Sequence, residues 1–257
     1  MPKRRAVIIT TTVLVVAIGA MAAYGVWRVL SAAPEEVSLD AAVAVVQEQE
    51  SSRKDVENKP AHLDANQDVT SQPFSQDGVW RLDSETGTFS FEQSTGSFVG
   101  FRVKEELAKI GAVTAVGRTG QVDGELSIDE GKLQRVSVTA DLSSLVTNDS
   151  RRDRAARHAL NVKENPTATF TLNQPLELPE TDGSEVSLQA NGQLTVNGIS
   201  RDVVVELSAQ LVENTIVVVG STEVTFADYD VAVPSASIVV SAEDHGVVEF
   251  QLLFVRD

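Results

Sequence analysis

The sequence contains no cysteine and only three histidines among its 257 residues. Without cysteine the chain can form no disulfide, no thiolate metal site and no thiol nucleophile. The histidines, His62, His158 and His245, lie far apart in the sequence, which argues against a histidine-based zinc site. We therefore expect neither a resident metal nor a cofactor.

Basic residues are also scarce, since 21 lysines and arginines face 37 acidic residues and the formal net charge is -16. A surface of this sign repels the phosphates of nucleic acids and of anionic lipids, so no nucleic-acid partner is expected. The N-terminus is the exception, because residues 1–30 contain Lys3, Arg4, Arg5 and Arg28 and no acid.

The segment 6–27 carries no charge over 22 residues. As a helix it would extend about 33 Å, which matches the hydrocarbon thickness of a bilayer. The basic residues before it predict a cytoplasmic N-terminus, with the rest of the chain on the extracytoplasmic side of the cell membrane. Residues 1–30 are thus expected to form a basic end and a single transmembrane signal-anchor, which contacts the lipid bilayer through residues 6–27.

A cleaved signal peptide is the alternative interpretation of this segment. Small residues at 20–22 and at 31–33 resemble sites that signal peptidase accepts, although the apolar run is longer than a typical signal peptide requires. The protein would then be secreted. Both interpretations export everything that follows.

Residues 31–77 have the composition of a linker. They contain ten acidic and three basic residues and a single aromatic residue, Phe74. Such a segment buries too little apolar surface to offset the conformational entropy that its chain would lose on folding. A short helix over 39–47, with Ser38 as its N-cap, is plausible within an otherwise flexible tether whose root-mean-square reach is about 38 Å.

From Gly78 to the end, the sequence alternates between apolar and polar residues with a period of two, which is typical of half-buried β-strands. The alternating runs lie at 99–103, 122–128, 136–142, 168–172, 188–196, 203–207, 224–226 and 248–254. Turn signals separate them, for example Asp182-Gly183 and Asn197-Gly198. About eight antiparallel strands within residues 78–257 predict a sandwich or a closed barrel, and short helices are expected at 148–160 and 105–110.

Several motifs of this domain occur in the order that is found in the YceI-like family. They are Phe98–Val103, Asp123–Leu126, Thr147–Asp153, Asn165–Phe170 and Gly192–Val203. The chain resembles this family over residues 78–257, and it differs from the usual pattern at Asn165 and Asp202. The resemblance implies an all-β fold, an eight-stranded antiparallel lipocalin-like β-barrel whose interior binds a polyisoprenoid or another long apolar chain. In this chain the barrel would be preceded by a transmembrane helix and an acidic linker.

Inward-facing apolar side chains are the candidates for contact with such a ligand. They are Val99, Phe101, Val103, Leu126, Val138, Ala140, Phe170, Leu194, Val205, Phe226, Phe250 and Leu252. An eight-stranded barrel is wide enough either to be filled by its own side chains or to hold one small ligand. Periodicity does not separate core filling from cavity lining, so both remain open for each residue.

The sequence 151–158 contains the domain's only basic cluster. Arg151, Arg154 and Arg157 could meet a diphosphate or another acidic headgroup at the mouth of the barrel. The alternative is a helix whose arginines pair with neighbouring acids.

No catalytic residue is expected. The Asp244-His245 pair suggests a hairpin turn, and the chain contains no Gly-x-Ser-x-Gly nucleophile elbow. The sequence therefore predicts a membrane-tethered protein that holds an isoprenoid-like or quinone-like molecule for transport, storage or sequestration. The alternative is a noncatalytic interaction module that has a filled barrel and recruits a partner protein at the cell surface.

Overall fold

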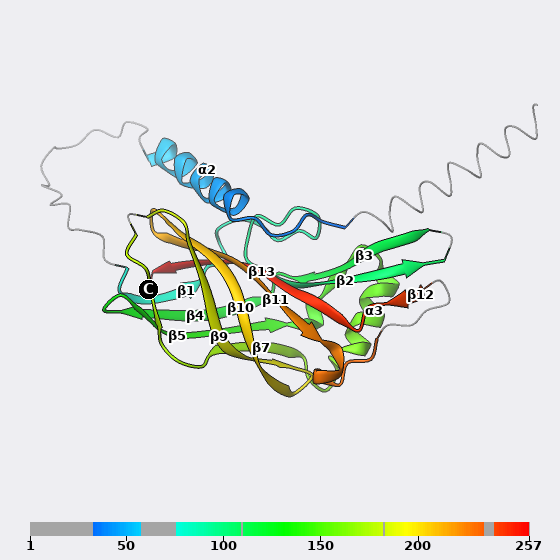
Figure 1. Ribbon diagram of the computed structural model, residues 1–257. Helices are drawn as coiled ribbons and strands as arrows, with labels where there is room; N and C mark the ends of the chain where they lie inside the picture. Colours follow the sequence, from blue (N-terminus) through cyan, green and yellow to red (C-terminus); the bar gives the residue numbers. More distant parts are fainter. Residues whose placement is uncertain (1–32, 58–75, 109, 182, 234–238, 257) are drawn as a thin grey trace, which may run out of the picture.

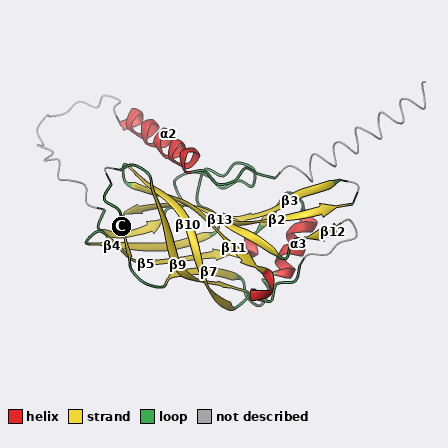
Figure 2. Cartoon of the chain, in the orientation of Figure 1, coloured by secondary structure: helices red, strands yellow, loops and turns green. Residues whose placement is uncertain are grey.

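The computed structural model describes residues 33–57, 76–108, 110–181, 183–233 and 239–256. Its centre is a ring of eight antiparallel strands, in the order β1-β4-β5-β7-β9-β10-β11-β13, that closes through pairing of β13 with β1 (Figure 1). The predicted all-β, eight-stranded barrel is confirmed. Two helices and two 3-10 turns accompany it within the described residues (Figure 2).

The ring strands span most of the domain. They are β1 (Gly78–Leu82), β4 (Val122–Asp129), β5 (Lys132–Asp141), β7 (Thr167–Leu172), β9 (Val186–Val196), β10 (Ile199–Val212), β11 (Thr215–Thr225) and β13 (His245–Arg256). Further strands extend or flank the ring, namely β2 (Phe98–Leu107), β3 (Gly111–Thr119), β6 (Val146–Thr147), β8 (Leu176–Glu177) and β12 (Val239–Ala242).

Strand β13 is the branch point of the sheet. Its first half pairs with β2 through the register Val247↔Arg102 to Gln251↔Phe98, and its last residues pair with β1 through Phe254↔Leu82 to Arg256↔Trp80. Strand β2 continues beyond the ring as a hairpin with β3. The hairpin occupies the sequence 105–107, where a helix was expected. That prediction was wrong, because the backbone of these residues pairs with Ala112 and Val113 on one side and with β12 on the other.

Helix α2 (Leu39–Glu57) lies against the outside of the barrel, across β10 and β11 (Figure 1). It buries Leu39, Ala42, Val43 and Val46 against outward-facing side chains of three ring strands, which are Val212, Val217, Val219 and Leu253. The helix is longer than the predicted one, and it is packed. The expectation of a flexible linker over 31–77 was therefore wrong for residues 39–57.

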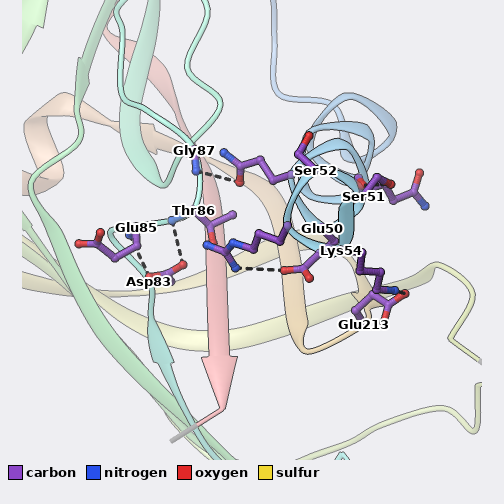
Figure 3. Close-up of polar contacts among 12 residues, drawn as sticks. Glu50, Ser51, Ser52, Lys54, Asp83, Glu85, Thr86, Gly87 and Glu213 are labelled. Carbon is purple, nitrogen blue, oxygen red and sulfur yellow. Dashed lines mark hydrogen bonds and ion pairs between the residues drawn. The ribbon is translucent and has the colours of Figure 1, made fainter. Parts of the chain in front are cut away.

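Polar contacts hold the C-terminal half of α2 in place (Figure 3). Lys54 Nζ lies 3.1 Å from the carboxylate of Glu213 in the β10–β11 turn. The backbone N–H of Gly87 donates to the side-chain oxygen of Gln49 over 3.2 Å, and the loop of Gly87 is itself shaped by Asp83, which accepts from the N–H groups of Glu85 and Thr86. These bonds connect α2 with two different loops of the barrel.

The chain just before α2 is held by a buried ionic cluster on the outer faces of β2, β3 and β13. Glu249, whose side chain is 2% exposed, lies 2.7 Å from both Arg102 and Arg118. The two guanidinium groups also donate to main-chain carbonyls of the segment before α2, Arg102 to Pro34 and Arg118 to Glu35. We call Glu249, Arg102 and Arg118 the outer triad. Its buried charges pair with one another, and it ties residues 34–35 to the barrel wall.

Helix α3 (Ser150–Ala159) confirms the helix expected at 148–160. Asp149 is its N-cap and accepts from the N–H of Arg151 over 2.8 Å. Asp153 accepts from both the N–H and the hydroxyl of Thr147 over 2.7 Å, which fastens the helix to β6.

No helix within the described ranges is both long and apolar enough to cross a bilayer. The predicted span 6–27 lies outside these ranges.

Candidate functional site

An apolar cavity of about 170 Å³ lies inside the ring of strands. All eight ring strands except β1 contribute lining side chains, as do β2 and the chain around β8. The lining is almost entirely aliphatic and aromatic, and several of its inward-facing side chains, such as Phe170, Phe250 and Leu207, are only half-buried. The barrel therefore has an interior that its own side chains do not fill.

This space stays open because several lining side chains are small and because the Phe170 ring lies flat against the wall. Ala140, Ala168, Ala190 and Ala209 line the cavity, where larger residues would fill it. At Gly192, a Cβ atom would come within 2.2 Å of the Phe170 ring, so the ring lies directly against the backbone of β9. Glycine at this position lets the aromatic ring cover the wall and keeps it out of the centre.

Nine of the twelve predicted interior residues line the cavity: Val99, Leu126, Val138, Ala140, Phe170, Leu194, Val205, Phe250 and Leu252. The other three do not. The Phe101 ring covers Gly117, where a Cβ would lie 2.5 Å from it, and Val103 is buried further along β2. Phe226 belongs to the 3-10 turn η2 (Phe226–Tyr229) and packs near Gly246, so its assignment to a strand was wrong.

The predicted site residues did not include several lining residues of the last strands and of the loop near β8. They include Leu178, Pro179, Thr181, Ser184, Leu211, Ile216 and Val218. Ile216 and Val218 lie in the run Ile216–Val219, which has no polar residue and so shows no alternation. Both faces of this strand are buried, the inner one by the cavity wall and the outer one by α2. An uninterrupted apolar run is the signal that could have identified it.

The cavity reaches solvent at one end of the barrel. We call this the loop end: residues 76–78, the turns 129–132 and 212–215, and the loop residues 178–181 and 183–185. Pro179 and Ser184 are exposed, and they are the only exposed residues of the lining. Four of the six polar lining residues, Gln76, Thr181, Ser184 and Gln210, also lie at or beside this end.

Helix α3 lies at the other end, the helix end, together with η2 and the turn 196–199 (Figure 1). None of the predicted headgroup residues lines the cavity. Arg151 and Arg154 are exposed on α3, and Arg157 donates to the carbonyls of Ser143 and Leu145 over 3.0 and 3.3 Å. Arg157 is thus bonded to backbone carbonyls and not to an acid. The ion pair with a neighbouring acid, which was the alternative interpretation of this cluster, is made by Arg152.

Glu105 is buried beside α3, 3.3 Å from Arg152. Burial raises the pKa of this carboxyl, and the positive charge of Arg152 opposes the rise. The pair joins β2 to α3, and neither residue reaches the cavity.

The Asp244-His245 pair lies apart from this cavity. The Asp244 carboxylate and the His245 ring lie 3.0 Å apart on the surface where β13 begins, away from the cavity lining. Within the part of the chain that the structure describes, no three metal-ligating side chains converge.

Residues 80–254 match the model of the YceI-like domain family. Among solved structures, a polyisoprenoid-binding domain from Saccharophagus degradans, implicated in plant cell wall breakdown, is 18% identical. The match covers 63% of this chain and 94% of that one, with a TM-score of 0.50. BcnA from Burkholderia cenocepacia is 20% identical, over 61% of this chain and 95% of its own, with a TM-score of 0.49.

A YceI protein from Campylobacter jejuni is 19% identical over 55% of this chain and 84% of its own, with a TM-score of 0.45. No curated protein matches.

Proposed function

The chain belongs to the YceI-like family, and from this premise and the geometry of its cavity we propose that it binds a long apolar molecule, of the polyisoprenoid or quinone type, inside the barrel. The observation that carries the proposal is the unfilled apolar interior. Its volume of about 170 Å³ exceeds that of an engineered cavity of about 150 Å³ that stays dry and binds benzene. The similarity to the Saccharophagus degradans domain, which is polyisoprenoid-binding, supports the same ligand class.

Binding of this kind needs no catalytic group. Each 100 Å² of apolar surface removed from water contributes about 2.5 kcal/mol before the costs of ordering the ligand. The cavity as it stands accommodates a segment of an isoprenoid chain. A longer ligand extends through the loop end, where the loop residues 178–181 and 183–185 line the mouth. The proposed role is therefore transport, storage or sequestration, without a reaction.

We further propose that the barrel works on the extracytoplasmic side of a membrane, tethered through residues 6–27. The uncharged run and the basic residues before it support this topology. The outer triad holds Pro34 on the barrel, so a tether from Trp27 to Pro34 spans at most about 25 Å. The barrel would then stay closer to the bilayer than a flexible linker over 31–77 allows.

The alternative function, a module with a solid barrel that recruits a partner protein, has less support. It requires a filled interior, and the interior of this barrel is open along several strands.

Two adjacent residues of β10 allow a matched test. Val205 lines the cavity, whereas Val204 points outward and is 50% exposed. We expect the full chain, purified from the membranes of its host, to yield a stoichiometric apolar lipid on organic extraction and mass spectrometry. Val205→Phe should lose that lipid and Val204→Phe should retain it. Ala209→Phe, at a half-buried lining position, serves as a second blocking variant if Val205→Phe does not fold.

An empty extract from the unmodified chain would contradict the proposal. Equal lipid content in Val205→Phe, Ala209→Phe and the unmodified chain would contradict it as well, because both blocked positions face the cavity.

A further inference from the structure

The loop end combines the mouth of an apolar cavity with a ring of acidic side chains. If the cavity holds an apolar chain, as proposed above, the polar end of that ligand lies at this mouth. The acids lie directly beside lining residues in the sequence: Glu180 between Pro179 and Thr181, Glu185 between Ser184 and Val186, and Asp129 after Ile128. These three carboxylates are exposed.

The basic residues of the loop end do not offset these charges. Lys132 is engaged by Glu177 at 2.7 Å, and Lys54 by Glu213 at 3.1 Å. Arg256, which lies over the Trp80 ring and donates to the carbonyl of Asp77, adds one positive charge against the three carboxylates. Among the described residues, no ion pair joins Glu180, Glu185 or Asp129 to a basic group, so the mouth keeps an excess of negative charge.

The groups that line the mouth are uncharged. Thr181 and Ser184 carry hydroxyls, which lie 3.2 Å from each other, and Gln76 carries an amide. Such groups can exchange hydrogen bonds with a neutral oxygen, while the carboxylates around them repel an anion. The arginines of α3 could have attracted a phosphate, but they lie at the helix end, outside the lining.

We propose that the loop end selects apolar chains that carry a neutral polar group, such as an alcohol, an amide or a quinone, and discriminates against the same chains with a phosphate or carboxylate. The tail occupies the cavity, and the neutral group lies among Gln76, Thr181 and Ser184. Negative charge at Glu180, Glu185 and Asp129 supplies the discrimination.

The test compares two lipids with the same tail. The full chain in phosphatidylcholine nanodiscs is titrated with geranylgeraniol or with geranylgeranyl phosphate, and the lipid retained by the protein is counted by native mass spectrometry. We expect the alcohol to be retained about tenfold more strongly at low ionic strength. The ratio should shrink in 1 M salt, where the Debye length falls to about 3 Å.

Charge reversal at the mouth should remove the discrimination. Glu180→Lys/Glu185→Lys should bring the ratio close to one, whereas Glu164→Lys/Asp228→Lys, the same change of charge on exposed residues of the helix end, should leave it near tenfold. Each variant is titrated with the same two lipids. Differences in how the lipids partition into the bilayer are therefore the same for every variant and cancel when the variants are compared.

Retention of the phosphate at least as strongly as the alcohol would overturn this proposal and leave the proposed function standing. Loss of that phosphate binding in Arg151→Ala/Arg154→Ala would then place the headgroup at the helix end. An equal effect of the two charge-reversed variants would also overturn it. Retention of neither lipid would overturn the proposed function and the selectivity together.

Discussion

Leu252 and Leu253 are neighbours on β13, yet they lie in two different cores. Leu252 faces the cavity, where the inner cluster around Trp80 and Phe254 stops short of filling the ring. Leu253 faces outward and is completely buried beneath α2 together with Val46 and Val217. The members of the outer core are almost completely buried, while the inner core borders the cavity. The wall at β13 is therefore buried on both faces, while its inner face still borders open space.

The largest effect is expected from the outer triad. Glu249→Gln leaves Arg102 and Arg118 buried without a countercharge, and removal of one partner from a buried ionic cluster typically costs about 3–5 kcal/mol. Urea unfolding of the full chain should show a loss of unfolding free energy in this range. Replacement of all three by apolar residues, Arg102→Met/Arg118→Met/Glu249→Leu, should recover much of it. A loss below about 1 kcal/mol in the single variant would mean that the triad does not fasten the wall.

The two leucines give the most direct comparison of the cores. Substitution of a buried leucine by alanine costs about 2–5 kcal/mol, and the cost rises with the volume of the new cavity that the substitution creates. We expect Leu253→Ala near the upper end of that range and Leu252→Ala near the lower end, because Leu252 already borders empty space. Thermal or urea unfolding of the two variants measures the difference. Equal losses would argue that the inner core is as closely packed as the outer one.

A smaller, pH-dependent effect is expected at Glu105, near the helix end. Because burial raises its pKa above the ordinary value, the folded state retains this proton at pH values where the unfolded chain has released it. The wild-type stability contribution of Glu105 therefore decreases as the pH rises from 4.5 through the raised pKa. Glu105→Gln does not titrate, so its stability relative to the wild type should rise across that window and level off above it. Unfolding curves of both proteins between about pH 4 and pH 8 provide the measurement, and parallel pH profiles would contradict the expectation.

The smallest effect should come from Lys54 and Glu213, whose side chains are 59% and 54% exposed. An exposed ion pair contributes about 0.2–1 kcal/mol and is screened by salt. Lys54→Ala should therefore lower the unfolding free energy by about 0.5 kcal/mol or less, which would show that α2 is held by its apolar face. A loss comparable to that of Leu253→Ala would instead assign the attachment of α2 to this contact.

Alternation along the strands was sufficient to predict the barrel and most of its lining. Leu126 and Val138 are examples, since each lies between polar neighbours and faces the cavity. Alternation identifies inward-facing residues where one face of a strand is buried and the other is exposed to solvent. It does not separate Val99, which lines the cavity, from Val103, which lies on the same face of β2 and packs elsewhere. How deep a residue lies along the barrel axis depends on the register of its strand, and the alternation of apolar and polar residues gives no information on register.

Helix α2 was underestimated because its composition is that of a linker. Its apolar residues are small, and polar or acidic residues surround them, so the segment alone buries little. The evidence for its packing lies far away, in the all-apolar run Ile216–Val219 and in Leu253. The outer triad was not predictable either, since Arg102, Arg118 and Glu249 meet only when three strands are aligned.

The branching of β13 has a consequence for how the protein is made. The ring closes through pairs such as Trp80↔Arg256, between its first strand and its last, so a nascent chain has no closed barrel until β13 has been synthesised. Before that moment the edges of β1, β2 and β11 lack their partner, and such unpaired edges are templates for aggregation. Contacts of this sequence separation also form slowly. The cavity is therefore a late product of biosynthesis, and chaperones would meet this protein as an open sheet.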